Sequence, residues 1–266
     1  MTGGEELAAL ALEAARAGAE LVRDRASRGV TVAATKSSEV DVVTEADRAC
    51  EALLRKLLRE ARPDDGFFGE EESEEPGTSG VRWVIDPIDG TVNFLYGLPQ
   101  YAVSIAAERD GEVVAGVVLN AATGTEYVAH LDADGVGTAT RDGRPIGVRA
   151  PAPLSQRLVA TGFHYDAELR GIQARAMVHL LPRVRDIRRL GSCALDLCHV
   201  AEGSIDAYVE EGVNLWDHAA GGLVARVAGA TTEVTRGAGG RDLMLCAPSH
   251  GFDEFRAAVQ EAGFIG

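Results

Sequence analysis

The sequence has few cysteines, and their spacing is irregular. Four of them occur in 266 residues, at Cys50, Cys193, Cys198 and Cys246. None forms a C-x-x-C pair, and none has the spacing of zinc-finger ligands. We therefore expect reduced, buried thiols rather than a disulfide framework.

Long hydrophobic runs are also missing. The longest apolar stretches, at residues 101–107 and 113–119, are far shorter than the roughly 18 apolar residues that a membrane span needs. The N-terminal segment carries Glu5 and Glu6 in an alanine-rich helical pattern, without a basic leader or a clear cleavage site. These absences predict no membrane association, no export signal and a cytoplasmic location.

Positive charge is scarce. Lysine and arginine number 26 against 41 acidic residues, which gives a formal net charge of -15. The electrostatic field of a chain with this net charge repels nucleic acid and anionic membranes, so we expect no direct nucleic-acid partner. It also repels phosphorylated small molecules, unless bound divalent cations supply local positive charge. A phosphate-binding function would therefore need a metal site.

The chain contains ordinary amounts of hydrophobic and charged residues, 46% and 25%, and its apolar periodicity changes near the middle. Helical spacing predicts helices at residues 5–25 and 44–61, and short apolar runs predict strands at 81–85, 102–107, 113–119, 127–130 and 137–140. After three prolines in residues 145–153, strands are expected at 157–161, 207–209, 232–234 and 243–247, alternating with helices at 169–184, 192–201, 216–228 and 252–262. We predict an α+β domain at residues 1–147 and an α/β domain at 148–266.

A turn with two carboxylates is the first candidate for chemistry. Asp86 and Asp89 lie three residues apart, directly after the expected strand at 81–85 and before a short helix. The backbone amides of Gly90 and Thr91 would lie at the start of that helix, where they could receive phosphate oxygens. The turn could thus offer metal ligands and anion donors together. By itself it fits an acidic turn with a helix cap equally well.

Two further carboxylates strengthen the metal hypothesis. Glu70 follows an apolar run, and Asp217 begins an otherwise apolar helix. If they converged on the turn, they would add hard oxygen ligands of the kind that Mg²⁺ prefers. Taken singly, residues 70–75 would be a solvated acidic loop and Asp217 a helix cap.

Five stretches occur in a fixed order along nearly the whole chain. They are K-S-S beginning at Lys36 with D-V-V-T-E-A-D ending at Asp47, G-E-E around Glu70, D-P-I-D-G-T-V-N-F beginning at Asp86, the block at residues 189–210, and W-D ending at Asp217. Together they resemble the inositol monophosphatase family, in its bacterial inositol-1-monophosphatase branch. The resemblance implies a layered αβαβα sandwich of the inositol monophosphatase and fructose bisphosphatase type, and a homodimer.

The resemblance also implies an active site with two to three Mg²⁺ ions, at which Li⁺ inhibits by occupying a Mg²⁺ position. A first ion would be held or bordered by Glu70, Asp86, the carbonyl of Ile88 and Thr91. A second would be held by Asp86, Asp89 and Asp217, and Glu70 would help to place a third through water. Such ions neutralise phosphate oxygens and activate water for in-line attack, without a covalent enzyme intermediate.

The remaining site residues follow from the same resemblance. Thr91 and Asp47 resemble a hydrogen-bonded pair that activates the attacking water together with Glu70, because a threonine hydroxyl alone is a weak base. Lys36 would have a supporting role beside the metal site. The implied substrate contacts are Asp89, Gly191, Ser192, Cys193, Glu210 and Asp217, with Cys193 at a position where alanine is common.

These features predict a Mg²⁺-dependent phosphatase for a small polyol monophosphate, with inositol 1-phosphate as the substrate that the inositol branch favours. Histidinol phosphate, fructose 1,6-bisphosphate and a nucleoside bisphosphate remain open as substrates of the same reaction. A role of another class, as a protein-binding regulatory partner in transcription, also remains open.

Overall fold

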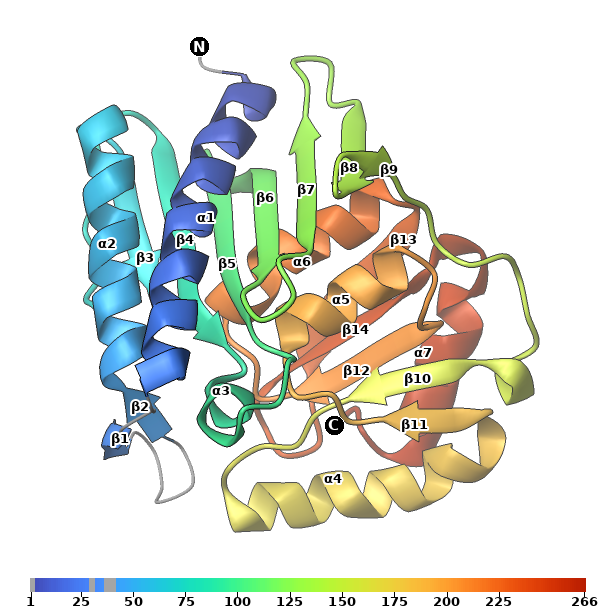
Figure 1. Cartoon of the computed structure of the whole chain (residues 1–266). Coiled ribbons are helices and arrows are strands. Elements are labelled where there is room, and N and C mark those ends of the chain that lie inside the picture. Colours follow the sequence, from blue (N-terminus) through green and yellow to red (C-terminus); the bar gives the residue numbers. More distant parts are fainter. Residues whose placement is uncertain (1–2, 29–31, 36–41) are drawn as a thin grey trace.

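The computed structural model describes residues 3–28, 32–35 and 42–266. Within these ranges, helices and sheets alternate in layers, and Figure 1 shows their order from one side of the molecule to the other. Helices α1 (Gly4–Arg28) and α2 (Glu45–Ala61) cover one face of a seven-stranded sheet. Helices α5 (Cys193–Ala201) and α6 (Leu215–Val227) lie between this sheet and a five-stranded one. Helices α4 (Ala167–Leu180) and α7 (Phe252–Ala262) cover the far face of the second sheet. This arrangement confirms the expected αβαβα sandwich.

The helices have clear bounds, and several start at a capping residue. The expected capping box of α2 is present, since Thr44 and Asp47 exchange hydrogen bonds at its N-terminus. The helices are α1 (Gly4–Arg28), α2 (Glu45–Ala61), α3 (Thr91–Tyr96), α4 (Ala167–Leu180), α5 (Cys193–Ala201), α6 (Leu215–Val227) and α7 (Phe252–Ala262).

The seven-stranded sheet has the order β3-β4-β5-β6-β7-β8-β9, and all of its neighbours are antiparallel except β3 and β4. Its strands are β3 (Gly66–Gly69), β4 (Val81–Asp89), β5 (Ala102–Arg109), β6 (Glu112–Asn120), β7 (Glu126–Leu131), β8 (Gly137–Arg141) and β9 (Arg144–Pro145). A separate antiparallel pair joins β1 (Val32–Thr35) and β2 (Val42–Thr44).

The five-stranded sheet has the order β11-β10-β12-β14-β13 and is mixed, with β10 parallel to both of its neighbours. Its strands are β10 (Leu158–Thr161), β11 (Asp186–Arg188), β12 (Ala207–Glu211), β13 (Ala230–Arg236) and β14 (Asp242–Pro248). Short 3₁₀ turns at Leu154–Gln156, Leu181–Arg183 and Ser249–Gly251 connect these elements.

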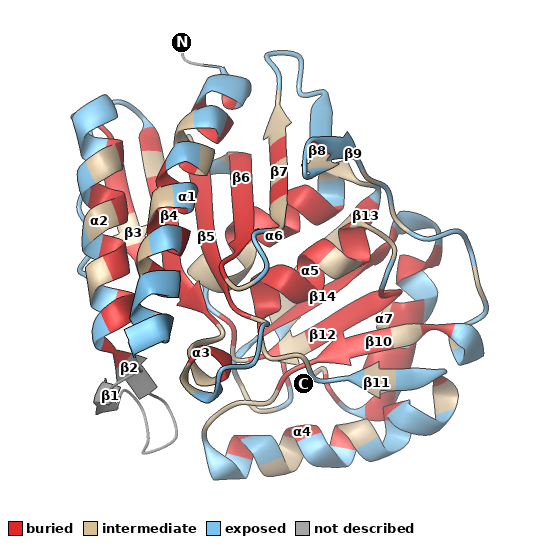
Figure 2. Ribbon diagram, in the orientation of Figure 1, coloured by how far each residue is buried: buried red, intermediate tan, exposed pale blue. Residues whose placement is uncertain are grey.

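The middle helices α5 and α6 are buried along most of their length, as Figure 2 shows. Small residues allow this close packing: a Cβ added at Gly116 of β6 would lie 2.9 Å from the carbonyl oxygen of Ala220 in α6. One hydrophobic cluster contains Val118 from the first sheet and Tyr208 from the second. The core therefore spans the expected boundary at residues 147 and 148, and the division into two domains stays a prediction.

Some expected elements differ from those observed. The helix predicted at residues 169–184 is α4, which ends at Leu180 and gives way to a 3₁₀ turn containing Pro182. Proline has no backbone N–H to continue the helix, and it restricts the residue before it. Strands β1, β2, β3, β9 and β11 were not predicted, because segments of two to four residues are too short to show a clear periodicity.

The sequence predicted free, buried cysteines and no membrane span, and both predictions can be compared with the described residues. All four cysteines are buried and free, as expected. In the ranges that the structure covers, every helix is too short or too polar to cross a bilayer.

Candidate active site

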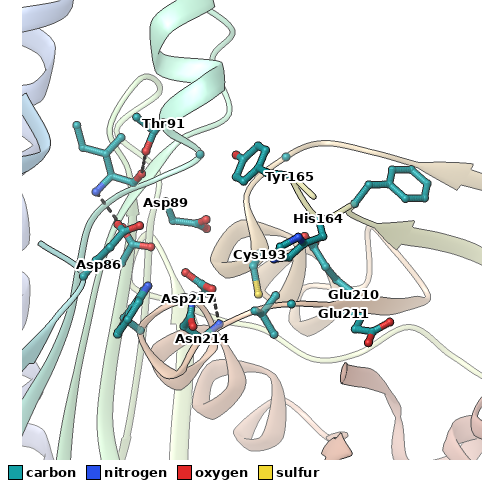
Figure 3. Close-up of a pocket in the computed structure, with 18 of the residues that line it drawn as sticks. Asp86, Asp89, Thr91, His164, Tyr165, Cys193, Glu210, Glu211, Asn214 and Asp217 are labelled. Carbon is teal, nitrogen blue, oxygen red and sulfur yellow. Dashed lines mark hydrogen bonds between the residues drawn. The ribbon is translucent and has the colours of Figure 1, made fainter. Parts of the chain in front are cut away.

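A β-bulge in β4 brings the two carboxylates of the acidic turn to the same side. Asp86 pairs with Ser104 of β5, whereas Asp89 pairs with Ala102, so three steps along β4 correspond to two steps along β5. Residues three apart in a regular strand point to opposite faces. The extra residue in the bulge turns the side chains of Asp86 and Asp89 to the same face of the sheet, and both reach one cavity (Figure 3).

Gly90 turns the chain from this strand into α3. Its φ is 98°, in the left-handed region that favours glycine. A Cβ at this position would also lie 2.8 Å from the carbonyl oxygen of Gln100 and 3.1 Å from that of Gly191. The predicted turn from strand to helix therefore depends on glycine here, for conformational and for steric reasons.

Asp217 reaches the same cavity from the first turn of α6. One of its carboxylate oxygens, Oδ2, accepts a hydrogen bond from the backbone N–H of Asn214 at 2.6 Å, so it caps the helix. One oxygen each of Asp86, Asp89 and Asp217 lies within 4.8 Å of the other two. Asp217 therefore caps the helix and also belongs to the carboxylate cluster, so the two interpretations of this residue do not exclude each other.

Burial makes this cluster electrostatically unfavourable. It raises the pKa of Asp217 well above its usual value, and the charges of Asp89 and Glu70 raise it further. Burial likewise raises the pKa of Asp89 to about 6, against the opposing hydrogen bonds that Ser192 and the backbone of Ala194 donate to it. A divalent cation bound between such carboxylates would offset the repulsion between their charges. Their hard oxygen atoms are ligands of the kind that Mg²⁺ prefers.

Glu70 lies beside the cluster because β3 runs parallel to β4. Gly69 pairs with Ile85, and the backbone N–H of Glu70 donates to the carbonyl of Ile85 at 3.2 Å. Ile85 directly precedes Asp86, so the two carboxylates follow neighbouring strands at the same sheet edge. The expected convergence of Glu70 on the acidic turn is observed, and Glu70 lines the cavity.

The loop at residues 70–75 is held in place by a buried ion pair that the sequence did not reveal. The carboxylate of Glu51 in α2 accepts hydrogen bonds from the backbone N–H groups of Glu71 and Glu72 at 2.8 and 3.1 Å. Arg55, one turn later, donates to Glu51 at 2.9 Å, and both side chains are buried. An ion pair spaced i,i+4 on the inner face of an amphipathic helix was the only available signal.

Thr91 and Asp47 form the predicted pair. The Thr91 hydroxyl lies 3.1 Å from Asp47 Oδ1 and 3.1 Å from the carbonyl oxygen of Ile88. Burial raises the pKa of Asp47, although hydrogen bonds from Thr44 oppose this effect. Thr91 and Ile88 line the cavity, whereas Asp47 does not. Asp47 is connected to the cavity by its hydrogen bond with Thr91.

The cavity has a volume of about 230 Å³, and most of the predicted substrate contacts lie on its wall. Gly191, Cys193 and Glu210 are among the lining residues. Ser192 is not: it is buried behind Asp89, and its hydroxyl donates to Asp89 Oδ2 at 2.5 Å. Its observed contact therefore orients another side chain. Lys36 lies outside the described residues.

Glu210 is itself oriented by a neighbour on β12. The hydroxyl of Tyr208 donates to Glu210 Oε2 at 2.8 Å. Burial raises the pKa of Glu210 to about 7, and the bond from Tyr208 opposes that rise. Tyr208 is fully buried, so it affects the cavity through Glu210.

Part of the wall was not anticipated. The segment that follows β10 contributes side chains opposite the acidic turn, and Figure 3 shows His164 and Tyr165 across the cavity from Asp86 and Thr91. Its only signal was its place after a buried strand, where ligand sites of α/β folds gather. The unanticipated lining residues are Phe163, His164, Tyr165, Glu211, Gly212, Val213 and Asn214.

Comparison with known proteins shows the family of this chain. The sequence profile described as "Inositol monophosphatase family" matches residues 4–259. The chain is 46% identical over 246 residues to an inositol-1-monophosphatase of Mycobacterium bovis, which covers 89% of this chain and 84% of that protein. It is 37% identical over 222 residues to Nus factor SuhB of Pasteurella multocida, with 83% and 82% covered. The solved structure of Mycobacterium tuberculosis SuhB superposes with a TM-score of 0.84 and 38% identity over the whole of both chains. The chain therefore belongs to the inositol monophosphatase family of phosphoric monoester hydrolases.

Proposed function

We propose that this enzyme is a Mg²⁺-dependent phosphatase for small polyol monophosphates, and that it hydrolyses inositol 1-phosphate to inositol and phosphate. The observation that carries the proposal is the convergence of Asp86, Asp89 and Asp217 at one cavity. The names of its relatives from Mycobacterium support the inositol substrate.

The metal would be held by carboxylates that already lie together. Asp86, Asp89, Asp217 and Glu70 would bind two to three Mg²⁺ ions, with the carbonyl of Ile88 as a further oxygen ligand. When bound, Mg²⁺ supplies positive charge that offsets the phosphate charge, and it lowers the pKa of water. A small monovalent cation such as Li⁺ would compete for one of these positions and inhibit.

The phosphate would lie against the start of α3. The backbone amides of Gly90 and Thr91 belong to residues on the cavity wall and would donate to its oxygens. In a chain with a net charge of -15, these amides add attraction for an anion without adding a side-chain cation.

Thr91 and Asp47 would receive the proton of the attacking water. The Thr91 hydroxyl has one hydrogen, and when it donates this to Asp47 Oδ1 its lone pairs are available to accept from water. As the water attacks, its proton would pass to Thr91 while the original hydroxyl proton passes to Asp47. The raised pKa of Asp47 suits it to accept that proton. Glu70 would orient the water, and Lys36 would support the site.

The hydroxyl groups of the polyol would contact the opposite wall. Asp89, Gly191, Cys193 and Glu210 line this part of the cavity and offer carboxylate, backbone and thiol groups. Glu210, which Tyr208 holds in place, suits the hydroxyl groups of a polyol better than an amine or a nucleotide. A homodimer, which the family resemblance implies, and a cytoplasmic location, which the sequence predicts, are both part of the proposal.

A phosphate-release panel tests the proposal. Inositol 1-phosphate, histidinol phosphate, fructose 1,6-bisphosphate and adenosine 3',5'-bisphosphate would be assayed with and without Mg²⁺, and with millimolar Li⁺ added. We expect Mg²⁺-dependent release, highest kcat/KM for inositol 1-phosphate, inhibition by Li⁺, and no turnover by the Asp86→Asn variant. If wild-type enzyme releases no phosphate from any ester, the proposal is wrong.

A second candidate function rests on two relatives that are named Nus factors, from Pasteurella multocida and Haemophilus influenzae. In this case the chain would act as a protein-binding partner in transcription. Binding of purified host transcription complexes, measured equally for wild type and Asp86→Asn, would support it. No binding by either form would leave only the phosphatase.

A further inference from the structure

The side-chain amide of Asn93 joins three segments beside the catalytic cavity. Asn93 is the third residue of α3 and is 5% exposed. Its Nδ2 donates to the carbonyl oxygens of Gln100 and Leu190 at 2.7 and 2.8 Å, and the carbonyl oxygen of Gly191 lies 3.3 Å away. Because all three neighbours are acceptors, the NH₂ end of the amide is the end that faces them.

Two of these carbonyls belong to the loop at residues 189–193, which forms part of the cavity wall. Arg189, Gly191 and Cys193 of this loop line the cavity. Gly191 has a φ of 90°, in the region that glycine adopts readily. Among the described residues, the carbonyls of Leu190 and Gly191 accept no hydrogen bond from a backbone N–H. Asn93 therefore supplies the hydrogen bonds that hold this part of the loop.

The other end of the connection is the acidic turn. Gly90 and Thr91, the last residues of that turn, line the cavity and lead directly into α3. The carbonyl of Asn93 accepts the backbone N–H groups of Gly97 and Leu98, so Asn93 is also fixed to the end of this helix. Asn93 does not itself line the cavity. It can therefore affect a bound molecule only through the segments that it joins.

We propose that Asn93 is a positioning residue that sets the distance between the acidic turn and the 189–193 loop, and thereby selects the polyol. The inference rests on the proposed function, in which the turn holds the phosphate and the loop contacts the hydroxyl groups. A substrate that spans both must carry its hydroxyl groups at the matching distance from its phosphate. A phosphate ester without such hydroxyl groups does not use the loop, and its hydrolysis depends much less on Asn93.

Ser192 holds the same loop in a different way. Its hydroxyl donates to Asp89 Oδ2 at 2.5 Å, so it orients a carboxylate of the cluster. Asn93 instead binds the backbone of the two residues that precede Ser192. The two contacts therefore have separable effects, one on the carboxylate cluster and the other on the wall that faces the polyol.

The test compares Asn93→Asp and Asn93→Ala with wild type on inositol 1-phosphate and on 4-nitrophenyl phosphate, whose ring has no hydroxyl groups. Aspartate keeps the shape of asparagine but places a carboxylate oxygen against three carbonyls. Alanine removes the donor without adding charge, and it provides the answer if the aspartate variant does not fold. We expect the ratio of kcat/KM for inositol 1-phosphate to kcat/KM for 4-nitrophenyl phosphate to fall at least about tenfold, which corresponds to about 1.4 kcal/mol. The fall should come mainly from a higher KM for inositol 1-phosphate rather than from kcat.

Asn120→Asp is the matched control. Asn120 is also a buried asparagine, 6% exposed, and its Nδ2 donates at 3.3 Å to the carbonyl of Pro99, which directly precedes Gln100. In the described part of the chain, its side chain forms no hydrogen bond with the 189–193 loop. The control should keep the wild-type ratio, even if thermal unfolding shows that it lowers stability. A parallel loss of both substrates in the Asn93 variants, or an equal fall of the ratio in Asn120→Asp, would overturn the positioning role.

The positioning role can also be tested if wild type hydrolyses neither ester, an outcome that would refute the phosphatase proposal. Calorimetry with Mg²⁺ present would then compare the binding of inositol 1-phosphate and of inorganic phosphate. Weaker binding of inositol 1-phosphate alone in Asn93→Ala supports the positioning role. Equal affinities of wild type and variant, an equal loss for both ligands, or no binding of inositol 1-phosphate by wild type refutes it.

Discussion

Asp89 is oriented by a residue that lies 103 positions further along the chain. The Ser192 hydroxyl donates to Asp89 Oδ2 at 2.5 Å, and the backbone N–H of Ala194 donates to the same oxygen at 2.7 Å. Ser192 also caps α5, because its Oγ accepts the backbone N–H of Leu195. A single serine thus joins the start of a buried helix to a carboxylate of the site.

Ser192→Ala should therefore weaken both the fold and metal binding. We expect the free energy of unfolding to fall by about 1–3 kcal/mol, because a buried carboxylate loses a donor and α5 loses its cap. The Mg²⁺ concentration for half-maximal activity should rise, since the loss of the donor raises the pKa of Asp89. Urea unfolding and Mg²⁺ titration measure the two effects. Ser27→Ala, at the exposed end of α1, is the control, and equal Mg²⁺ requirements in both variants would contradict the role of Ser192.

At the scale of elements, the site depends on how closely α6 approaches the first sheet. Gly116 of β6 faces the backbone of Ala220, and a Cβ there would lie 2.9 Å from its carbonyl oxygen and 3.0 Å from its Cα. Backbone atoms cannot move aside as the end of a flexible side chain can. Because α6 carries Asp217 and β4 carries Asp86 in the same sheet as β6, this contact helps to set the distance between the carboxylates.

Gly116→Ala should displace α6 and separate the carboxylates. Overpacking of this kind costs about 1–3 kcal/mol of stability, and Mg²⁺ affinity should fall in parallel. Gly147→Ala is a suitable control, because a Cβ there meets only the carbonyl of Ala228, at 3.8 Å. Thermal unfolding and Mg²⁺ calorimetry provide the measurements. Lower stability with unchanged Mg²⁺ affinity would mean that the spacing of α6 does not control the cluster.

Local signals explain which elements were predicted correctly. The capping residues and apolar face of α2 are contained within one segment, and the helix is found where expected. By contrast, β3 is only four residues long and exists because β4 pairs beside it. The bulge between Asp86 and Asp89 is likewise a property of the pairing with β5. Elements that depend on a distant partner leave no periodic pattern in their own residues.

For the whole molecule, we expect the carboxylate cluster to make stability dependent on pH and, if a cation binds there, on metal. Burial raises the pKa of Asp89 to about 6 in the folded protein, above its ordinary value of 3.8. Without metal, the folded form holds this proton more tightly than the unfolded form, so the contribution of Asp89 to stability is lost as pH rises from about 4 to 6. A bound cation reverses the balance, because it prefers the ionised carboxylate.

Mg²⁺ should therefore raise the melting temperature more at pH 7.5 than at pH 5. At pH 5 protons compete for Asp89 and Asp217, whereas at pH 7.5 Asp89 is ionised and Mg²⁺ at 100 times its Kd would add about 2.7 kcal/mol. Scanning calorimetry at both pH values, with and without Mg²⁺, measures the difference. Ca²⁺-free and Mg²⁺-free samples of Asp86→Asn provide the baseline. An equal Mg²⁺ effect at both pH values would contradict the assignment.

The sequence by itself identified the carboxylates of the candidate site and predicted the turn that carries two of them. The acidic turn, the glycine that follows it and the capping box of α2 depend on neighbouring residues, so short-range patterns and their resemblance to a family sufficed. The tertiary structure decided what those residues contact. It brought Asp217 to the acidic turn, placed Ser192 behind Asp89 rather than on the cavity wall, and set His164 on the wall opposite Asp86. These contacts join segments that are far apart in sequence, and only the packing of α6 and the two sheets brings them within reach.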